Sequence, residues 1–195
     1  MSAAAPSAQP KLRVKNATKA YNTRSGELVA IDRCSLDVKA GEIVSIVGPS
    51  GCGKTTLLWS MSGLHKLSSG EVLLDGKPVN GPNPEIGMVF QDANLLPWRN
   101  LDANINFPFE IKGTKPDRAW IDDLLGRVGL SGFGGRFPRE LSGGMQQRAA
   151  LVRALSFKPS VLLMDEPFGA LDAFTREEMN QLVEEIWMAA PTTIV

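Results

Sequence analysis

The chain has 195 residues, of which 43% are apolar, and its 21 acidic side chains balance its 21 basic ones. These values are typical of one globular domain and exclude an intrinsically disordered protein. The balanced charge gives no general attraction to nucleic acid, so we expect no nucleic-acid partner. No apolar stretch approaches the roughly 18 residues that cross a bilayer, so we expect membrane association only through a partner.

Two local features carry no expected chemistry. Residues 1–10 are rich in Ala, Pro and Ser and lack the pattern of a secretory signal, so they are expected to form a disordered tail. Cys34 and Cys52 do not have the spacing of a metal or redox site, which predicts two plain thiols in a reducing cytosol.

The first half of the chain has a β pattern interrupted by one helix. Residues 12–18 and 28–38 alternate loosely and predict antiparallel strands, and the apolar run 43–47 predicts a strand buried on both faces. A helix is expected from Lys54 to Met61, ending at Gly63. The Asp75-Gly76 turn predicts a hairpin over 71–79, and another short strand is expected over 86–90.

The second half is mainly helical. Residues 92–156 have helical periodicity, residues 161–164 predict a second buried strand, and the apolar spacing after 173 predicts a helix that ends at Pro191. Residues 192–195 are expected to open one more strand. The order predicts one α/β domain over 11–195, with a parallel-sheet core (11–91 and 157–195) and a helical insert (92–156).

A glycine-rich loop between the strand at 43–47 and the helix at 54–61 has the pattern of a phosphate-binding loop. Its glycines let successive backbone N–H groups point at phosphate oxygens, and the helix N-terminus adds partial positive charge. Lys54 can reach the β- and γ-phosphates, and the Thr55 hydroxyl can bind Mg²⁺. The predicted nucleotide-binding residues here are Gly48, Pro49, Ser50, Gly51, Cys52, Gly53, Lys54, Thr55 and Thr56.

The strand at 161–164 ends in two carboxylates, Asp165 and Glu166. After a phosphate loop, an acid at the end of a buried strand is expected to hold Mg²⁺ directly or through water. The next residue can face the γ-phosphate and take a proton from the attacking water. We therefore predict Asp165 as a metal ligand and Glu166 as the catalytic base.

The segment Leu141-Ser142-Gly143-Gly144-Met145-Gln146 identifies the kind of ATPase. Together with the phosphate loop it resembles the ATP-binding subunit of ABC transporters, over about residues 14–195. The resemblance implies a P-loop NTPase (RecA-like) α/β core, an N-terminal antiparallel β subdomain and an inserted helical subdomain. It also implies that Ser142, Gly143 and Gly144 contact the γ-phosphate held by a second subunit, in a head-to-tail dimer with ATP and Mg²⁺ as cofactors.

Three further residues match the family's pattern. Tyr21 resembles the aromatic residue that stacks on adenine, with a purely structural role as the alternative. Gln91 resembles the glutamine that touches Mg²⁺ and takes part in catalysis. Asp172, in Ala170-Leu171-Asp172, resembles the loop that crosses the dimer interface and borders the nucleotide.

The segment that follows Gln91 points to a subfamily. Leu95-Leu96-Pro97-Trp98 is similar to importers of nitrate, sulfonates or taurine, and its apolar residues are expected to receive a coupling helix of the transmembrane permease subunits. A core tryptophan is the alternative for Trp98. The resemblance implies a peripheral location on the cytoplasmic face of the inner membrane and an indirect partnership with a solute-binding protein.

The family also has a histidine after the strand at 192–195, and the sequence ends before it. The single histidine, His65, precedes that position and is expected to be an exposed loop residue. We therefore expect a chain that lacks the family's C-terminal part and hydrolyses ATP poorly. The alternatives to an ATP-hydrolysing importer subunit are a soluble ABC ATPase of repair or translation and a hydrolysis-deficient nucleotide-binding fragment.

Overall fold

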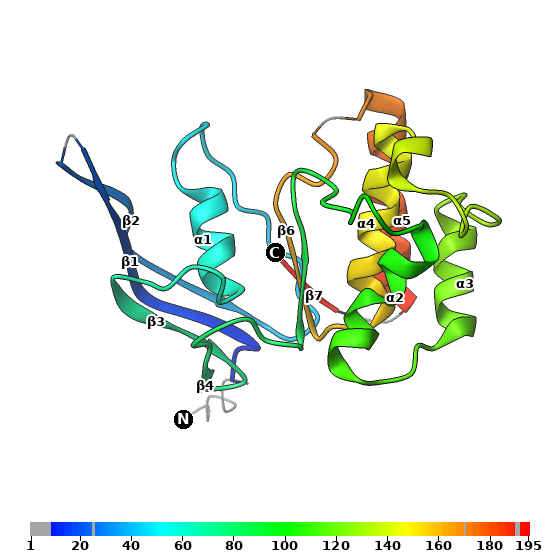
Figure 1. Cartoon of the computed structure of the whole chain (residues 1–195). Coiled ribbons are helices and arrows are strands. Elements are labelled where there is room, and N and C mark those ends of the chain that lie inside the picture. Colours follow the sequence, from blue (N-terminus) through cyan, green and yellow to red (C-terminus); the bar gives the residue numbers. More distant parts are fainter. Residues whose placement is uncertain (1–8, 25, 170, 190–191) are drawn as a thin grey trace. The chain divides into compact units, whose positions relative to one another are not determined.

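The computed structural model describes residues 9–24, 26–169, 171–189 and 192–195 (Figure 1). The chain divides into two compact units, residues 1–86 with 191–195, and residues 87–190. The predicted tail falls outside the described residues except for Gln9 and Pro10, and so does the predicted helix end at Pro191.

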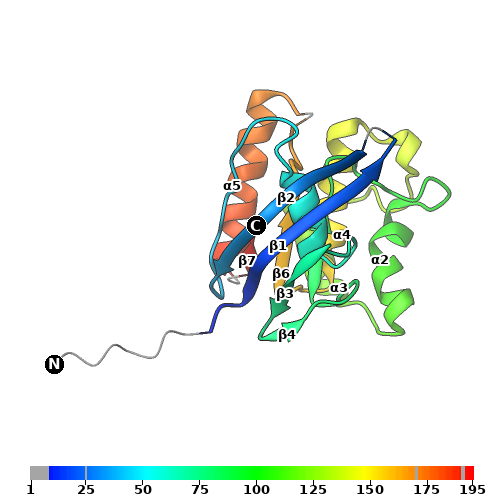
Figure 2. The same cartoon turned by 90° about the vertical axis from the view of Figure 1, so that its left-hand side faces the viewer.

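The first unit is built on a four-stranded sheet with the order β2-β1-β3-β4 (Figure 2). Its strands are β1 (Leu12–Thr23), β2 (Gly26–Val38), β3 (Ser69–Leu74) and β4 (Lys77–Pro78), and each neighbouring pair is antiparallel. The two predicted N-terminal strands are confirmed, with β1 longer than expected. The turn between β3 and β4 has positive φ at both Asp75 (49°) and Gly76 (75°), the geometry that a two-residue hairpin requires.

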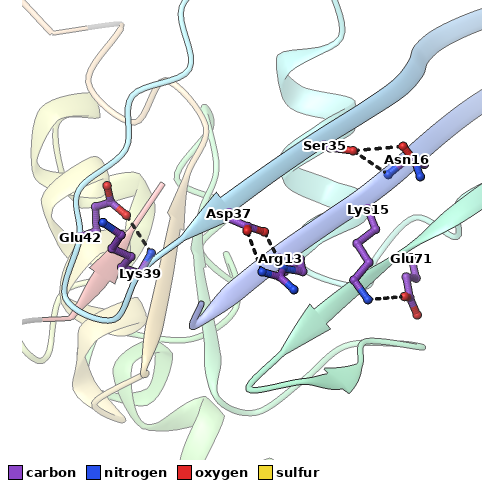
Figure 3. Close-up of polar contacts among 8 residues, drawn as sticks. All are labelled: Arg13, Lys15, Asn16, Ser35, Asp37, Lys39, Glu42 and Glu71. Carbon is purple, nitrogen blue, oxygen red and sulfur yellow. Dashed lines mark hydrogen bonds and ion pairs between the residues drawn. The ribbon is translucent and has the colours of Figure 1, made fainter. Parts of the chain in front are cut away.

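Polar side chains join the three main strands of this sheet (Figure 3). Arg13 on β1 donates two hydrogen bonds to Asp37 on β2, at 2.7 and 2.8 Å, and these hold the pKa of the Asp37 carboxyl below its usual value. Lys15 on β1 pairs with Glu71 on β3 at 3.1 Å. Because these pairs are exposed, they contribute more to strand register than to stability.

Helix α1 (Lys54–Met61) has the bounds that the sequence predicts. It buries Leu57, Leu58 and Met61, and the chain leaves it through Gly63, whose φ of 79° is in the left-handed region. The glycine ends the helix because other residues enter that conformation only at a cost.

The prediction that residues 43–47 form a strand buried on both faces is wrong. Ile43 forms one parallel bridge with Ile194 of β7 (Thr193–Ile194), and Val44 N–H donates to the Ile194 carbonyl at 2.9 Å. Beyond that point the segment has no ladder in this unit, and Val47 is 93% exposed. A two-residue partner strand is too short to pair the whole apolar run, so an apolar sequence alone did not predict its environment.

The second unit contains two short strands and four helices. β5 (Ile86–Val89) lies beside β6 (Val161–Met164), and the helices are α2 (Leu101–Lys112), α3 (Arg118–Arg127), α4 (Gly143–Ser156) and α5 (Ala173–Ala189). The short 3₁₀ turn η1 (Pro138–Glu140) precedes α4, which packs against both α2 and α3. Most apolar residues that repeat at helical spacing are buried, which confirms the predicted periodicity; they include Ile121, Leu124, Val152, Leu155, Met179 and Ile186.

Within the described residues, no helix combines the length and the hydropathy that crossing a membrane requires.

Gly63 offers a test of the packing behind α1. A Cβ at this position would overlap the carbonyl oxygen of Gly81, and the positive φ adds about 1–2 kcal/mol for any other residue. We predict that Gly63→Ala lowers the free energy of unfolding by more than about 2 kcal/mol in urea denaturation. Gly81→Ala is the matched control, since a Cβ there meets nothing within 4 Å and should change stability by less than about 0.5 kcal/mol. Equal effects of the two substitutions would contradict the close approach.

Candidate nucleotide-binding site

The glycine loop before α1 is pressed against strand β2. Gly51 and Gly53 have φ values of 81° and 97°. A Cβ at Gly53 would overlap the carbonyl oxygen of Ala30 on β2. Glycine is therefore required at Gly53 for two separate reasons, its backbone conformation and the neighbouring strand.

The N-terminus of α1 is open to an anion. Its first turn has no acidic residue, and the N-cap Gly53 has no side chain to accept a bond from the helix N–H groups. The Lys54 ammonium group reaches across the loop and donates to the carbonyl oxygens of Gly48 (2.9 Å) and Pro49 (3.2 Å). An ammonium group beside a helix N-terminus forms a positively charged site suited to phosphate.

Cys52 lies exposed in this loop as a free thiol. Its Sγ would lie 2.7 Å from a Cβ at Gly48, an overlap that rotation of the exposed Cys52 side chain would relieve. The Thr55 side chain is exposed at the start of α1, where its hydroxyl is accessible to a ligand.

Tyr21 lies half-buried near the end of β1. Its hydroxyl is 2.9 Å from Nδ1 of His65, and the Lys19 ammonium lies 4.8 Å from the centre of its ring. The expectation that His65 is an exposed loop residue is wrong: the ring is half-buried and packs edge-on against Trp59 of α1. This loop has no periodic pattern, so these contacts could not be predicted from the sequence.

In the second unit, Gln91 and the two carboxylates lie at one edge of the strand pair. The Asp165 N–H donates to the Val89 carbonyl at 2.9 Å, and each residue stands at the carboxyl end of its strand. β5 and β6 are therefore parallel. Gln91 comes shortly after the end of β5, and Asp165 and Glu166 come directly after the end of β6. This is the edge at which ligands bind in open α/β sheets.

The two carboxylates at this edge differ in their surroundings. Asp165 is 5% exposed, whereas Glu166 is exposed and has a positive φ of 46°. Non-glycine residues with such φ values are uncommon, and they cluster at functional sites where the surrounding structure holds them. The sequence predicts the two acids but not this backbone conformation.

Ser142 caps helix α4. Its hydroxyl oxygen accepts a hydrogen bond from the Met145 N–H at 3.3 Å, and Gly143 and Gly144 form the first helical turn. A Cβ at Gly143 meets nothing within 4 Å, so its backbone is open on that side. The helix start therefore presents the serine and the bare backbone that the sequence predicts.

Two side chains of α4 that sequence reasoning missed hold the segment after β5. Gln147 donates to the Gln91 carbonyl at 2.6 Å. Arg153 donates to the carbonyls of Ala93 (3.0 Å) and Asn94 (2.8 Å), and burial lowers the pKa of its guanidinium. The helix that begins at Ser142 thus also fixes the backbone around Gln91. A Gln and an Arg inside an apolar helical pattern were the available signal.

Asp172 shapes the start of α5. Its carboxylate accepts from the Thr175 N–H at 3.0 Å and from the Thr175 hydroxyl at 2.7 Å, and the bond from that N–H holds the Asp172 pKa below its usual value. Ala170, in the same predicted loop, lies outside the described residues.

Trp98 is 71% exposed, so the alternative of a core tryptophan is wrong. The side chain of Asn104 on α2, which is 0% exposed, forms hydrogen bonds with the backbone of the loop that carries Trp98. The Asn104 amide accepts from the Leu96 N–H at 2.7 Å and donates to the carbonyls of Leu96, Arg99 and Asn100. The buried amide therefore fixes the backbone on both sides of the exposed Trp98.

The predicted site residues are thus distributed over both units. Tyr21 and residues 48–56 belong to the first, and the second carries the others: Gln91, Ser142, Gly143, Gly144, Asp165, Glu166 and Asp172.

Comparison with known proteins agrees with these features. The sequence pattern of the family described as ABC transporter matches residues 31–169. The chain is 47% identical over 187 residues to a taurine import ATP-binding protein of Roseobacter denitrificans, covering 94% of this chain and 70% of that protein. It is 45% identical over 186 residues to an uncharacterized ABC transporter ATP-binding protein of Methanocaldococcus jannaschii, with the same coverage of 94% and 70%.

The solved structures give the same result for the fold. A dimeric ATP-binding cassette in a post-hydrolysis state, bound to ADP and phosphate, is 35% identical, with a TM-score of 0.84 over 94% of this chain and 86% of that one. This confirms the P-loop NTPase fold class and the ATPase class that the sequence predicts. The chain belongs to the ABC transporter family of ATP-binding proteins.

Proposed function

We propose that the chain binds and hydrolyses ATP to drive an importer of small sulfonates such as taurine. The observation that carries this proposal is that one chain has two loops that each begin a helix. The first is the glycine loop with Lys54 before α1, and the second is the Ser142-Gly143-Gly144 start of α4. A phosphate loop alone occurs in many ATPases, whereas the second loop is the feature that the ABC family shares.

The first unit supplies the residues that fit the phosphates and the base. The Lys54 ammonium and the uncapped N–H groups of α1 suit the β- and γ-phosphates, and the Thr55 hydroxyl suits the accompanying Mg²⁺. Tyr21 offers a half-buried ring on which adenine would stack.

The second unit supplies the residues for hydrolysis. The exposed Glu166 carboxylate would orient the attacking water and accept its proton, while the buried Asp165 and the amide of Gln91 would hold Mg²⁺ in place. Bound Mg²⁺ neutralises charge on the phosphate oxygens, and few protein ligands are needed because the phosphates provide the others.

A second copy of the chain is the proposed partner for closure. Ser142, Gly143 and Gly144 would contact the γ-phosphate bound by that copy, with Asp172 bordering the interface. The structural relatives crystallised as dimers support this arrangement. The exposed Trp98 would contact a permease subunit, and the chain would then lie at the cytoplasmic face of the inner membrane.

The proposed substrate class rests on the named relatives. Taurine import proteins from Roseobacter denitrificans, Yersinia pestis and Jannaschia are 46–48% identical to this chain. Other sulfonates and nitrate are the wider class that the segment 95–98 suggests, and the permease and solute-binding subunits would select among them.

We predict that Lys54→Ala weakens binding of Mg·ATP. Charge-assisted hydrogen bonds contribute about 1.5–3 kcal/mol each, so the dissociation constant from calorimetry should rise roughly 10- to 100-fold. Lys77→Ala, which removes an exposed ammonium from β4 of the same unit, is the matched control and should bind as the unaltered chain does. Unchanged affinity in Lys54→Ala would refute the assignment of the phosphate loop.

We also predict that Glu166→Gln retains ATP binding and accumulates an ATP-bound dimer, because glutamine keeps the shape of the side chain and removes the base. Size-exclusion chromatography with light scattering measures the dimer.

Ser142→Arg in the Glu166→Gln background should abolish the dimer while the monomer still binds ATP. A dimer that persists with Ser142→Arg would contradict the shared site.

The substrate proposal predicts ATP-dependent uptake of radiolabelled taurine by the intact transporter assembled with its own permease subunits. The same assembly carrying Lys54→Ala should show no uptake above background. If nitrate is transported and taurine neither enters nor competes, the taurine assignment is wrong, whereas the ATPase assignment stands.

A further inference from the structure

Among the described residues, no strand pairs with one side of the outer part of β1. Residues Lys19 to Tyr21 pair with β2, but the pairing of β1 with β3 ends at Thr18 and Ser69. A sheet edge of this kind leaves backbone groups without partners. Here the loop that follows α1, residues 65–68, covers the edge.

Several hydrogen bonds join this loop to β1. The Ser68 N–H donates to the Thr18 carbonyl at 2.8 Å, and the Ser68 hydroxyl accepts from the Ala20 N–H at 3.0 Å. The Lys19 ammonium donates to the Lys66 carbonyl at 2.8 Å. A further bond, at 2.9 Å, links the Tyr21 hydroxyl to Nδ1 of His65. Either group donates in this bond, depending on the tautomer of the imidazole ring.

The same loop is anchored to α1. The His65 N–H donates to the Trp59 carbonyl at 3.1 Å, and the two rings meet edge to face at 4.8 Å between centroids. Tyr21 is thus connected through His65 to the helix whose N-terminus carries the phosphate loop. The Lys19 ammonium covers one face of the Tyr21 ring, so a base that stacks on the ring would take the opposite face.

We infer that His65 is a positioning residue for nucleotide binding: it fixes the Tyr21 ring relative to α1, so that the base and the phosphates of one ATP meet their partners at the same time. This inference rests on the proposed ATP site. A ring held in place by its hydroxyl loses less freedom on binding, and affinity rises accordingly. Without His65, the Tyr21 side chain would have to be ordered by the ligand.

The test compares ligands with and without a base, in the 195-residue chain. Calorimetry measures the affinities of Mg·ATP and of Mg·tripolyphosphate. His65→Ala should weaken ATP roughly 3- to 10-fold, the effect of one lost hydrogen bond, and should leave tripolyphosphate unchanged. Tyr21→Phe, which keeps the ring and removes the hydroxyl, should have the same effect. His65→Asn places an amide near the position of Nδ1 and should restore most of the affinity.

A double-mutant comparison separates positioning from general damage. Tyr21→Ala should weaken ATP roughly 10-fold, and adding His65→Ala should then cost less than about twofold, because the two residues act through one contact. Leu64→Ala, a neighbouring half-exposed loop position outside these contacts, is the control and should bind ATP normally. Since the chain has one histidine and one tyrosine, ring NMR signals report each residue directly, and ATP should shift the Tyr21 signals more than tripolyphosphate does.

The possible results separate the positioning role of His65 from ATP binding itself. Equal loss of ATP and tripolyphosphate affinity in His65→Ala would overturn the inference, as would additive losses in the double mutant. Full ATP affinity in His65→Ala and Tyr21→Phe, with a loss in Tyr21→Ala, would mean that Tyr21 contacts the base without help from His65. Failure of the unaltered chain to bind either ligand would refute the proposed ATP site itself.

Discussion

The close approach of the glycine loop to strand β2 is the constraint on which the first unit depends. The Gly53 backbone lies against the Ala30 carbonyl, where a Cβ would overlap it, and α1 begins at the next residue. The direction of α1 relative to the sheet follows from this contact. So does the place of Lys54, whose ammonium group crosses back over the loop to two carbonyl oxygens. A stable sheet thereby holds an otherwise irregular phosphate loop.

In the second unit, one helix holds the irregular loop around Gln91. α4 begins at the Ser142 cap, and further along it Gln147 and Arg153 bond to the backbone carbonyls of residues 91–94. The loop around Gln91 forms no strand or helix, so its shape depends on these side chains. Two motifs that are distant in the sequence are therefore joined by hydrogen bonds through one helix.

Much of this could be predicted from the sequence, because periodicity and turn chemistry act locally. The bounds of α1 and β6, the hairpin at Asp75-Gly76 and the capping role of Ser142 all follow from residues within a few positions. The environment of residues 43–47 could not be predicted, since burial depends on which strands pair with an apolar run. His65 shows the same limit: one histidine in a loop carries no signal, and only the fold brings it to Tyr21.

A crystal structure of the chain with Mg²⁺ and a non-hydrolysable ATP analogue would show whether the glycine loop holds the nucleotide. We expect the β- and γ-phosphates at the N-terminus of α1, with the Lys54 ammonium within hydrogen-bond distance of their oxygens and the base stacked on Tyr21. Phosphates bound elsewhere, or a loop whose N–H groups turn away from the analogue, would contradict this expectation.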